Sequence, residues 1–218
     1  MSWTAFEPRA KEYDQWFDRH EPVYQAEVAA RRKFIPGEGL SLEVGIGTGW
    51  FAVPLGIRFG IGPSRGMLAI ARQHGLRVCQ AVGEQLPFRN EQFDVVLLVT
   101  VICFVDHVPA LLRELNRVLR QAGHLVIGFI NRNSERGRLY QSRKETSAFC
   151  RDAKFYSGEE VAAWVKEAGF DAMQWCQTLC GGLSELNVRD GFHNGAFVVL
   201  SARRGERAPG APPAIFNP

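Results

Sequence analysis

Residues 42–49 read Leu-Glu-Val-Gly-Ile-Gly-Thr-Gly, an apolar run that passes into three glycines at every second position. Because glycine has no Cβ, it adopts backbone angles that other residues avoid and lets a ligand lie directly against the main chain. In open α/β sheets, ligands bind beyond the carboxyl ends of the strands, where the strand order reverses. The stretch therefore predicts a strand followed by a ligand-binding turn at residues 45–50.

The glycine spacing differs from that of a dinucleotide site. The dinucleotide fingerprint is G-x-G-x-x-G, and counted from Gly45 its last position falls on Trp50. The spacing present is E-x-G-x-G-x-G, which begins at Glu43 and resembles motif I of the class I S-adenosylmethionine-dependent methyltransferases. A glycine-rich loop without a ligand is the alternative for this segment alone, so other segments have to agree.

The composition is that of one soluble domain, with 218 residues, 46% of them hydrophobic and 22% charged. The longest apolar stretch, residues 95–105, is interrupted by Thr100 and is far shorter than the roughly 20 residues of a membrane helix. The first residues carry charges and lack the apolar core of a secretory signal. We therefore expect a cytoplasmic protein that does not span a membrane.

Charge and cysteine usage point to a small-molecule partner. The net charge of +3 comes from interspersed acidic and basic residues, which favours no nucleic-acid partner. The five cysteines are scattered without the spacing of a metal site, so we expect reduced thiols and no bound metal. A soft-metal or arsenic site formed by Cys150, Cys176 and Cys180 is an alternative. The oligomeric state has no signal in the sequence.

Strand-like runs alternate with helical periodicity from residue 40 onward, which predicts an α/β fold with a mainly parallel sheet and helices on both faces. The seven expected strands are residues 40–44, 57–61, 78–82, 93–99, 124–130, 172–177 and 196–202. Helices are expected at 64–74, ending before Gly75, and at 108–119, where Pro109 fits the first turn. Ser157 and Glu160 form a capping box that opens a further helix, which ends at Gly169.

Two more segments resemble the same methyltransferase family, which includes ubiquinone- and sterol-methylating enzymes. Residues 59–68, Phe-Gly-Ile-Gly-Pro-Ser-Arg-Gly-Met-Leu, resemble the family pattern G-(I/V)-D-x-S-x-x-M-L. Residues 83–88, Gly-Glu-Gln-Leu-Pro-Phe, are followed by Phe-Asp-Val-Val at 93–96. The resemblance implies that the three segments wrap the methionine, ribose and adenine parts of S-adenosylmethionine. It also implies a Rossmann-like seven-stranded sheet whose last two strands form an antiparallel hairpin at one edge.

The N-terminal stretch Tyr13-Asp-Gln-Trp-Phe, with Tyr24 and Glu27 further on, resembles the entry segment of a small-molecule methyltransferase subgroup. The resemblance implies an aromatic lid over the cofactor. The alternative is a helix that packs Trp16 and Phe17 into the core. We expect a helical lid segment at residues 1–36, the methyltransferase domain at 37–205 and a disordered tail at 206–218, since proline, glycine and alanine dominate from residue 203 onward.

The resemblance implies that Glu43 orders the glycine loop and helps to hold the cationic amino group of the cofactor. The alternative role of Glu43 is a strand-end carboxylate that caps nearby backbone. Thr100 and Val101 resemble the loop whose backbone receives that amine, the alternative being a buried strand end without function. The cofactor-binding residues that the resemblance implies are Tyr13, Trp16, Glu43, Gly45, Gly47, Gly49, Gly62, Pro63, Met67, Gly83, Glu84, Gln85, Leu86, Thr100 and Val101.

One departure from the family pattern concerns the ribose. The family places an acidic residue at the end of the second strand to accept hydrogen bonds from both ribose hydroxyls, and this chain has Gly62 there. A charge-assisted hydrogen bond contributes about 1.5–3 kcal/mol, so its loss weakens binding roughly 10- to 100-fold unless another group substitutes. A second commonly acidic position holds Val82. Adenine contacts would then fall to the backbone of residues 83–86 and to packing by Met67 and Leu86.

Methyl transfer from a sulfonium needs alignment and exclusion of water rather than a catalytic triad. If the acceptor is an amine or a phenol, Tyr13, His107 or Tyr140 is a candidate base, although each is also an ordinary structural residue. Residues 131–156 form a polar insert of the kind that selects the acceptor, and its basic residues attract a carboxylate or simply face solvent.

These observations predict a methyltransferase that moves the methyl group of S-adenosylmethionine to a small-molecule acceptor. Two alternatives remain at this point. The first is a non-catalytic or repurposed nucleotide-binding protein with a degraded ribose site at Gly62. The second is a nicotinamide-dependent oxidoreductase, which Trp50 and Gly62 disfavour.

Overall fold

The structure, a computed structural model, describes residues 2–180 and 187–205. The tail expected at residues 206–218 lies outside the described residues. The change of composition at residue 203 does not mark the end of the sheet, because Arg203 and Arg204 belong to the last strand. Arg203 pairs with His124, and Arg204 pairs with Phe170 on the opposite neighbour.

Eight strands form one sheet in the described part of the chain, in the order β3-β2-β1-β4-β5-β8-β6-β7. Their bounds are β1 Ser41–Val44, β2 Phe59–Gly62, β3 Arg77–Gln80, β4 Phe93–Val99, β5 Leu119–Ile130, β6 Phe170–Thr178, β7 Arg189–Asp190 and β8 Phe197–Arg204. The first five pair in parallel, and β8 runs antiparallel to both β5 and β6. The predicted α/β fold with an antiparallel edge is confirmed.

Several strand bounds differ from the expected ones. Strand β5 begins at Leu119 rather than at residue 124, because Leu119 already pairs with Phe93 of β4. Its apolar side chain matches the helical periodicity that precedes it, so the sequence pattern placed it on the helix. Strand β3 ends at Gln80, and Val82 instead forms an isolated bridge with Gln85. Strand β7 was not predicted, since two residues carry no periodic pattern.

The helices are α1 Ala10–Arg19, α2 Glu21–Arg32, α3 Arg65–Gln73, α4 Val108–Val118, α5 Glu135–Arg143 and α6 Gly158–Glu167, with short 3-10 helices η1 Ser2–Arg9, η2 Val53–Leu55 and η3 Lys144–Thr146. The capping box of α6 is present, because the Glu160 amide donates to Ser157 Oγ at 3.3 Å and the Ser157 amide donates to Glu160 Oε2 at 2.7 Å. The polar insert at 131–156 contains α5 and η3, which the sequence did not predict.

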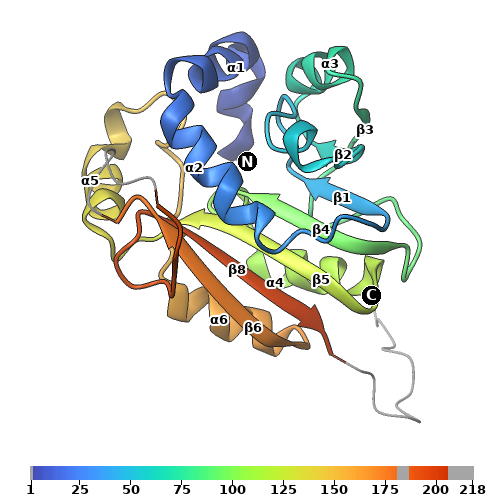
Figure 1. The fold of residues 1–218 in the computed structure, drawn as a ribbon. Coiled ribbons are helices and arrows are strands. Elements are labelled where there is room, and N and C mark those ends of the chain that lie inside the picture. The colour runs from blue at the N-terminus through green and yellow to red at the C-terminus, as the bar shows by residue number, and fades with distance from the viewer. Residues whose placement is uncertain (1, 181–186, 206–218) are drawn as a thin grey trace.

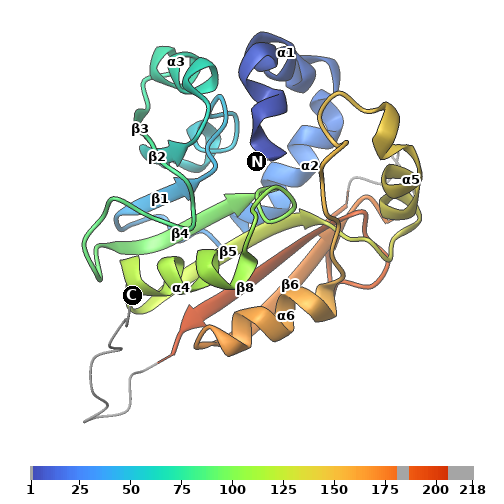
Figure 2. The same cartoon turned by 180° about the vertical axis from the view of Figure 1, so that it is seen from behind.

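Helices cover both faces of the sheet. Figure 2 shows α4 and α6 side by side on one face, whereas α2 crosses the opposite face (Figure 1). Alternate side chains of β4 lie on opposite faces of the sheet. Val96 and Leu98 pack with α4 and α6, whereas Val95 and Leu97 pack with the N-terminal helices. Strand β1 pairs with β2 on one side and with β4 on the other, so the strand order reverses at its carboxyl end. This is the place where a ligand site is expected.

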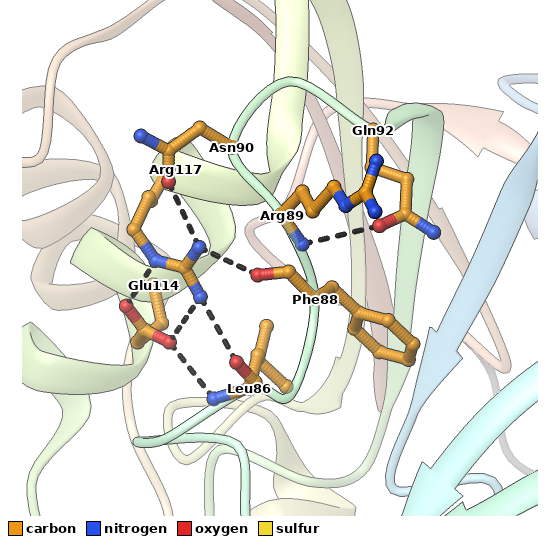
Figure 3. Close-up of polar contacts among 7 residues, drawn as sticks. All are labelled: Leu86, Phe88, Arg89, Asn90, Gln92, Glu114 and Arg117. Carbon is orange, nitrogen blue, oxygen red and sulfur yellow. Dashed lines mark hydrogen bonds and ion pairs between the residues drawn. The ribbon is translucent and has the colours of Figure 1, made fainter.

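Arg117 of α4 holds the chain that leads into β4 (Figure 3). Its guanidinium donates to the carbonyl oxygens of Leu86 at 3.0 Å and Phe88 at 2.8 Å. It also pairs with Glu114 at 2.6 Å, and the second oxygen of that carboxylate accepts from the Leu86 amide at 2.8 Å. Residues 86–88 are therefore fixed to the helix by hydrogen bonds to their own backbone.

We expect Arg117→Met to lower the free energy of unfolding by about 1–3 kcal/mol, because the half-buried carbonyls of Leu86 and Phe88 lose their donor. Urea unfolding followed by circular dichroism measures this change. Arg113→Met, on the exposed side of the same helix, is the matched control and should change stability by less than about 0.5 kcal/mol. Equal losses in the two variants would show that the backbone contacts of Arg117 contribute nothing.

Candidate functional site

A cavity of about 590 Å³ lies at the carboxyl end of β1, within the range of about 300–1,000 Å³ typical of small-molecule sites. The glycine turn, the end of β2 and residues 81–84 form one part of its wall. The residues after β4, the N-terminal helices and the insert at 131–156 form the rest. The predicted sequence motifs thus meet around one cavity.

Two glycines of the glycine turn line this cavity. Gly45 and Gly47 line it, with φ angles of +75° and +56° that other residues rarely adopt. A Cβ on Gly45 would lie 2.2 Å from Val101, and one on Gly47 would lie 3.3 Å from the Tyr13 ring. Gly49, expected at the cofactor, lies outside the cavity wall, because its own position is filled by Leu76, 2.2 Å from an added Cβ. Its place in the turn is explained by packing.

Hydrogen bonds attach the N-terminal segment to Trp50 in the glycine turn and to the start of α3. The Trp50 indole donates to Asp14 at 2.7 Å, and the Tyr24 hydroxyl donates to the Trp50 carbonyl at 2.6 Å. The Gly66 amide at the start of α3 donates to Glu7 at 3.2 Å. Tyr13 and Trp16 line the cavity, whereas Phe17 is buried and stacked on Trp50. The segment therefore lines the cavity, as the lid interpretation expects, and packs Phe17 into the core, as the alternative expects. The closing motion of a lid stays a prediction.

The end of β2 offers open space where the family carries a carboxylate. Gly62, Pro63 and Met67 all line the cavity. A Cβ on Gly62 would meet only Leu68 at 3.7 Å and the Ile46 amide nitrogen at 4.0 Å, which are ordinary contacts, and its φ lies outside the positive region. A side chain at this position would thus be accommodated without displacing the protein.

Part of the expected adenine segment lines the cavity and part does not. Gly83 and Glu84 are in the wall, together with Ala81 and Val82. Gln85 is exposed and Leu86 is buried, and both lie outside the wall. Leu86 is drawn toward α4 because Glu114 and Arg117 bind its amide and its carbonyl. Gln85 and Leu86 therefore do not line the cavity with Gly83 and Glu84.

The chain turns sharply after β4. Thr100 has a φ of +53°, although it is β-branched, and its amide donates to the Gly128 carbonyl at 2.7 Å. Such strained angles persist where the surroundings impose them and are frequent at binding sites. Thr100 and Val101 both line the cavity, beside Cys103, whose thiol donates to the Thr100 carbonyl at 2.9 Å.

Two carboxylates and one arginine lie around the site, and of these Arg31 and Glu43 are buried whereas Glu27 is half-buried. Arg31 of α2 is completely buried, with its guanidinium 3.8 Å from the Phe51 ring centroid, and none of its side-chain nitrogens makes a hydrogen bond within residues 2–180 and 187–205. Its Nη2 lies 3.8 Å from Glu27 Oε2. Glu43 is buried under the glycine turn, outside the cavity wall, and its Oε2 has no partner among the same residues.

Burial dominates the titration of these groups. Removal from water raises the pKa of Glu43 to about 8 and that of Glu27 to about 7, and the positive charge of Arg31 acts against both shifts. Burial lowers the pKa of Arg31 to about 10. The sequence did not single out Arg31, because a run of three basic residues at 31–33 resembles an exposed helix end.

The raised pKa of Glu43 makes stability depend on pH. The folded chain keeps a proton on Glu43 between its ordinary pKa of 4.5 and about 8, whereas the unfolded chain releases it, so stability falls as the pH rises through this window. We expect Glu43→Gln to match the wild type near pH 4.5 and to be more stable at pH 8 by at least about 1.4 kcal/mol, the equivalent of one pKa unit. Urea unfolding at pH 4.5, 6.5 and 8 measures this. A difference that stays constant with pH would contradict it.

The three candidate bases, Tyr13, His107 and Tyr140, all line the cavity. The pKa of Tyr13 is raised by burial and then by Glu43 and Glu27, which makes the phenol a poor base at neutral pH. His107 Nδ1 accepts the Ala110 amide at 3.1 Å and caps α4. Tyr140 stacks against Phe155 at 6.3 Å. Two of the three thus have structural roles that account for their positions.

In the described ranges, no helix combines the length and apolarity needed to cross a bilayer. The same ranges contain no group of three or more His, Cys, Asp or Glu side chains arranged to hold a metal ion.

The fold and the cavity define a Rossmann-like α/β protein with a small-molecule site at its glycine turn. The sequence profile of a family described as a methyltransferase domain matches residues 42–127. A solved structure from Thermotoga maritima, named as an S-adenosylmethionine-dependent methyltransferase and possible histamine N-methyltransferase, is 40% identical with a TM-score of 0.89 and covers 93% of this chain and 99% of its own. This chain belongs to the class I S-adenosylmethionine-dependent methyltransferases.

Two curated relatives extend the comparison. An uncharacterized protein of Methanocaldococcus jannaschii is 39% identical over 204 residues, which cover 92% of this chain and 99% of the relative. The demethylmenaquinone methyltransferase of a Mycobacterium species is 32% identical over 144 residues, covering 57% of this chain and 62% of that enzyme. The similarity is thus full-length to the archaeal protein and limited to part of the chain for the quinone-methylating enzyme.

Proposed function

We propose that this protein transfers the methyl group of S-adenosylmethionine to a small-molecule acceptor. The observation that carries the proposal is the glycine turn at the end of β1, where Gly45 and Gly47, both with positive φ, line a cavity of about 590 Å³. A ligand that needs close backbone contact fits this turn. Glu43 lies buried at the end of β1, and its Oε2 has no hydrogen-bond partner in the described residues.

The residues present fit this cofactor in a defined order around the cavity. Gly45, Gly47 and Thr100 would hold the methionine end, Gly62 and Pro63 would face the ribose, and Val82 to Glu84 with Met67 would surround the adenine. When bound, S-adenosylmethionine supplies a methyl group that is already activated by its sulfonium. The protein then has to align the acceptor and exclude water, which the aromatic N-terminal segment and the insert over the cavity are placed to do.

The volume of the cavity, about 590 Å³, supports a small acceptor rather than a macromolecule. Side chains of the N-terminal segment and of the insert at 131–156, among them Phe6 and Phe149, stack over it at 5.4 Å between ring centroids. The net charge of +3 supplies no reason to propose a nucleic-acid substrate. The Thermotoga relative, by its name, suggests an acceptor of similar scale.

Titration calorimetry with S-adenosylmethionine, S-adenosylhomocysteine and NAD tests the proposal against its two alternatives. We expect both adenosyl ligands to bind and NAD not to bind. Binding of NAD alone would favour an oxidoreductase, and binding of none would favour a non-catalytic protein whose ribose site was lost at Gly62. Transfer of a labelled methyl group to an acceptor then separates a working enzyme from a protein that only binds the cofactor.

A further inference from the structure

The carboxylate of Glu27 is a charged group in the cavity wall to which the proposed function assigns no role. It projects from α2 and lines the cavity, with 13% of its side chain exposed. Its neighbour Arg31 is 3.8 Å away, and no hydrogen bond to Glu27 occurs in residues 2–180 and 187–205. The ion pair with Arg31 at 3.8 Å leaves the carboxylate without a hydrogen-bond donor among these residues, so a ligand that donates a hydrogen bond to it would bind favourably.

The cavity around this carboxylate is mainly aromatic. Phe6 makes edge contacts with Tyr13 at 5.8 Å and Phe104 at 5.0 Å, and stacks with Phe149 at 5.4 Å between ring centroids. All four side chains line the cavity, as do Tyr140 and Phe155. Aromatic faces attract cations as well as apolar groups. The wall therefore suits a ligand with a cationic head and an apolar body.

Two arginines act on the Glu27 carboxylate within the described residues. The positive charges of Arg31 and Arg136 both lower the pKa of Glu27, whereas the pKa of Glu43 is lowered by Arg31. Of the basic residues of the insert, only Arg136 lines the cavity, with its guanidinium 5.7 Å from the Tyr140 ring centroid. Arg132 instead pairs with Glu160 at 2.7 Å. The insert thus brings one cation to the cavity rather than the basic surface that its sequence indicated.

We propose that the methyl acceptor is a small amine that enters as an ammonium ion and binds to the carboxylate of Glu27, with its apolar body against the aromatic wall. This inference rests on the proposed function, since it names the substrate class of that same site. Glu27 projects from α2, whereas the turn at residues 45–47 that we assign to the cofactor follows β1, and both line the cavity.

The same contact accounts for the proton that an ammonium ion must lose before it can attack. The ammonium gives one proton to the Glu27 carboxylate, and the lone pair released forms the new N–C bond as the S–C bond breaks with its electron pair left on sulfur. The product is a methylated ammonium and neutral S-adenosylhomocysteine. Burial raises the pKa of Glu27 to about 7, which is the range in which a carboxylate acts as a base at neutral pH.

Binding measurements on matched ligands test the proposal. The protein is saturated with S-adenosylhomocysteine and titrated with 2-phenylethylamine, 2-phenylethanol and phenylacetate, which share one body and differ in the head group. A second set with a propyl body, namely propylamine, propanol and propionate, allows for a smaller cavity. We expect the amine to bind at least about 10-fold more tightly than the alcohol in one set or both, and the carboxylate to bind worst.

Three variants test whether Glu27 causes the preference for the amine. Glu27→Gln keeps the shape and should remove the preference for the amine while leaving the affinity for the alcohol and for S-adenosylhomocysteine unchanged. Glu21→Gln removes the same charge from an exposed position of the same helix and should have no effect. Arg136→Gln should strengthen amine binding, because it removes a positive charge from the cavity wall. Thermal melting verifies that each variant is folded.

The outcomes separate this inference from the proposed function. If S-adenosylhomocysteine binds but the amine is not preferred in either set, or is still preferred by Glu27→Gln, the amine proposal is wrong and the methyltransferase proposal stands. Preference for the carboxylate with loss in Arg136→Gln would identify an acidic acceptor instead. Failure of S-adenosylhomocysteine to bind the wild type would remove the proposed function, and this inference with it.

Discussion

Alanine in place of Gly47 should lower the affinity for S-adenosylhomocysteine by at least about 100-fold, equivalent to about 2.7 kcal/mol. The added methyl group would stand in the cavity wall, 3.3 Å from the Tyr13 ring, in the space where a ligand has to approach the backbone. The φ of +56° lies in the left-handed region, so alanine adopts it at a cost of about 1–2 kcal/mol without unfolding the chain. Calorimetry measures the affinity, and thermal melting measures the strain.

Gly56→Ala is the matched control for this variant. Gly56 has a similar φ of +71°, an added Cβ would meet nothing within 4 Å, and the residue does not line the cavity. It should therefore show a comparable loss of stability and unchanged affinity. Equal losses of affinity in the two variants would mean that backbone strain, rather than contact with the ligand, governs binding.

Gly62→Asp should raise the affinity for S-adenosylmethionine and S-adenosylhomocysteine by roughly 10- to 100-fold, because a carboxylate at the end of β2 would accept hydrogen bonds from both ribose hydroxyls. The position tolerates the change, since the nearest atoms to an added Cβ lie at 3.7 Å and 4.0 Å. The gain is expected in binding and not in stability, because the new side chain faces the cavity.

The neutral variant Gly62→Asn isolates the contribution of charge. It has the same shape and should recover only a small part of the gain, since hydrogen bonds to a charged acceptor are about twice as strong as neutral ones. Weaker binding in Gly62→Asp, or identical binding in the two variants, would place the ribose elsewhere. Glycine at the end of β2 would then have no bearing on cofactor affinity.

The sequence predicted those parts of the molecule that depend on local patterns. Strand β4 is apolar along most of its length and was predicted at its observed bounds, residues 93–99. The glycines at 45 and 47 were predicted to face a ligand because they lack a Cβ and follow a predicted strand, and they line the cavity. Their contact with a ligand stays a prediction. The mainly parallel sheet followed from the alternation of strand-like runs and helical periodicity, and its antiparallel edge followed from the family resemblance.

What the sequence did not show depends on contacts between distant segments. Arg31 is paired with Glu27 one turn away and lies among Phe51 and Phe197, which come from two other parts of the chain. No local pattern separates such an arginine from an exposed one. Gln85 and Leu86 belong to a motif by sequence, yet α4 draws Leu86 out of the cavity wall through Glu114 and Arg117.

A crystal structure of the complex with S-adenosylhomocysteine would show where the cofactor lies. We expect the methionine end of the ligand on the main chain of Gly45 and Gly47, with the ribose next to Gly62 and the adenine near Gly83. A ligand bound elsewhere on the protein, or a glycine turn whose cavity side is closed by protein atoms in that complex, would contradict this placement.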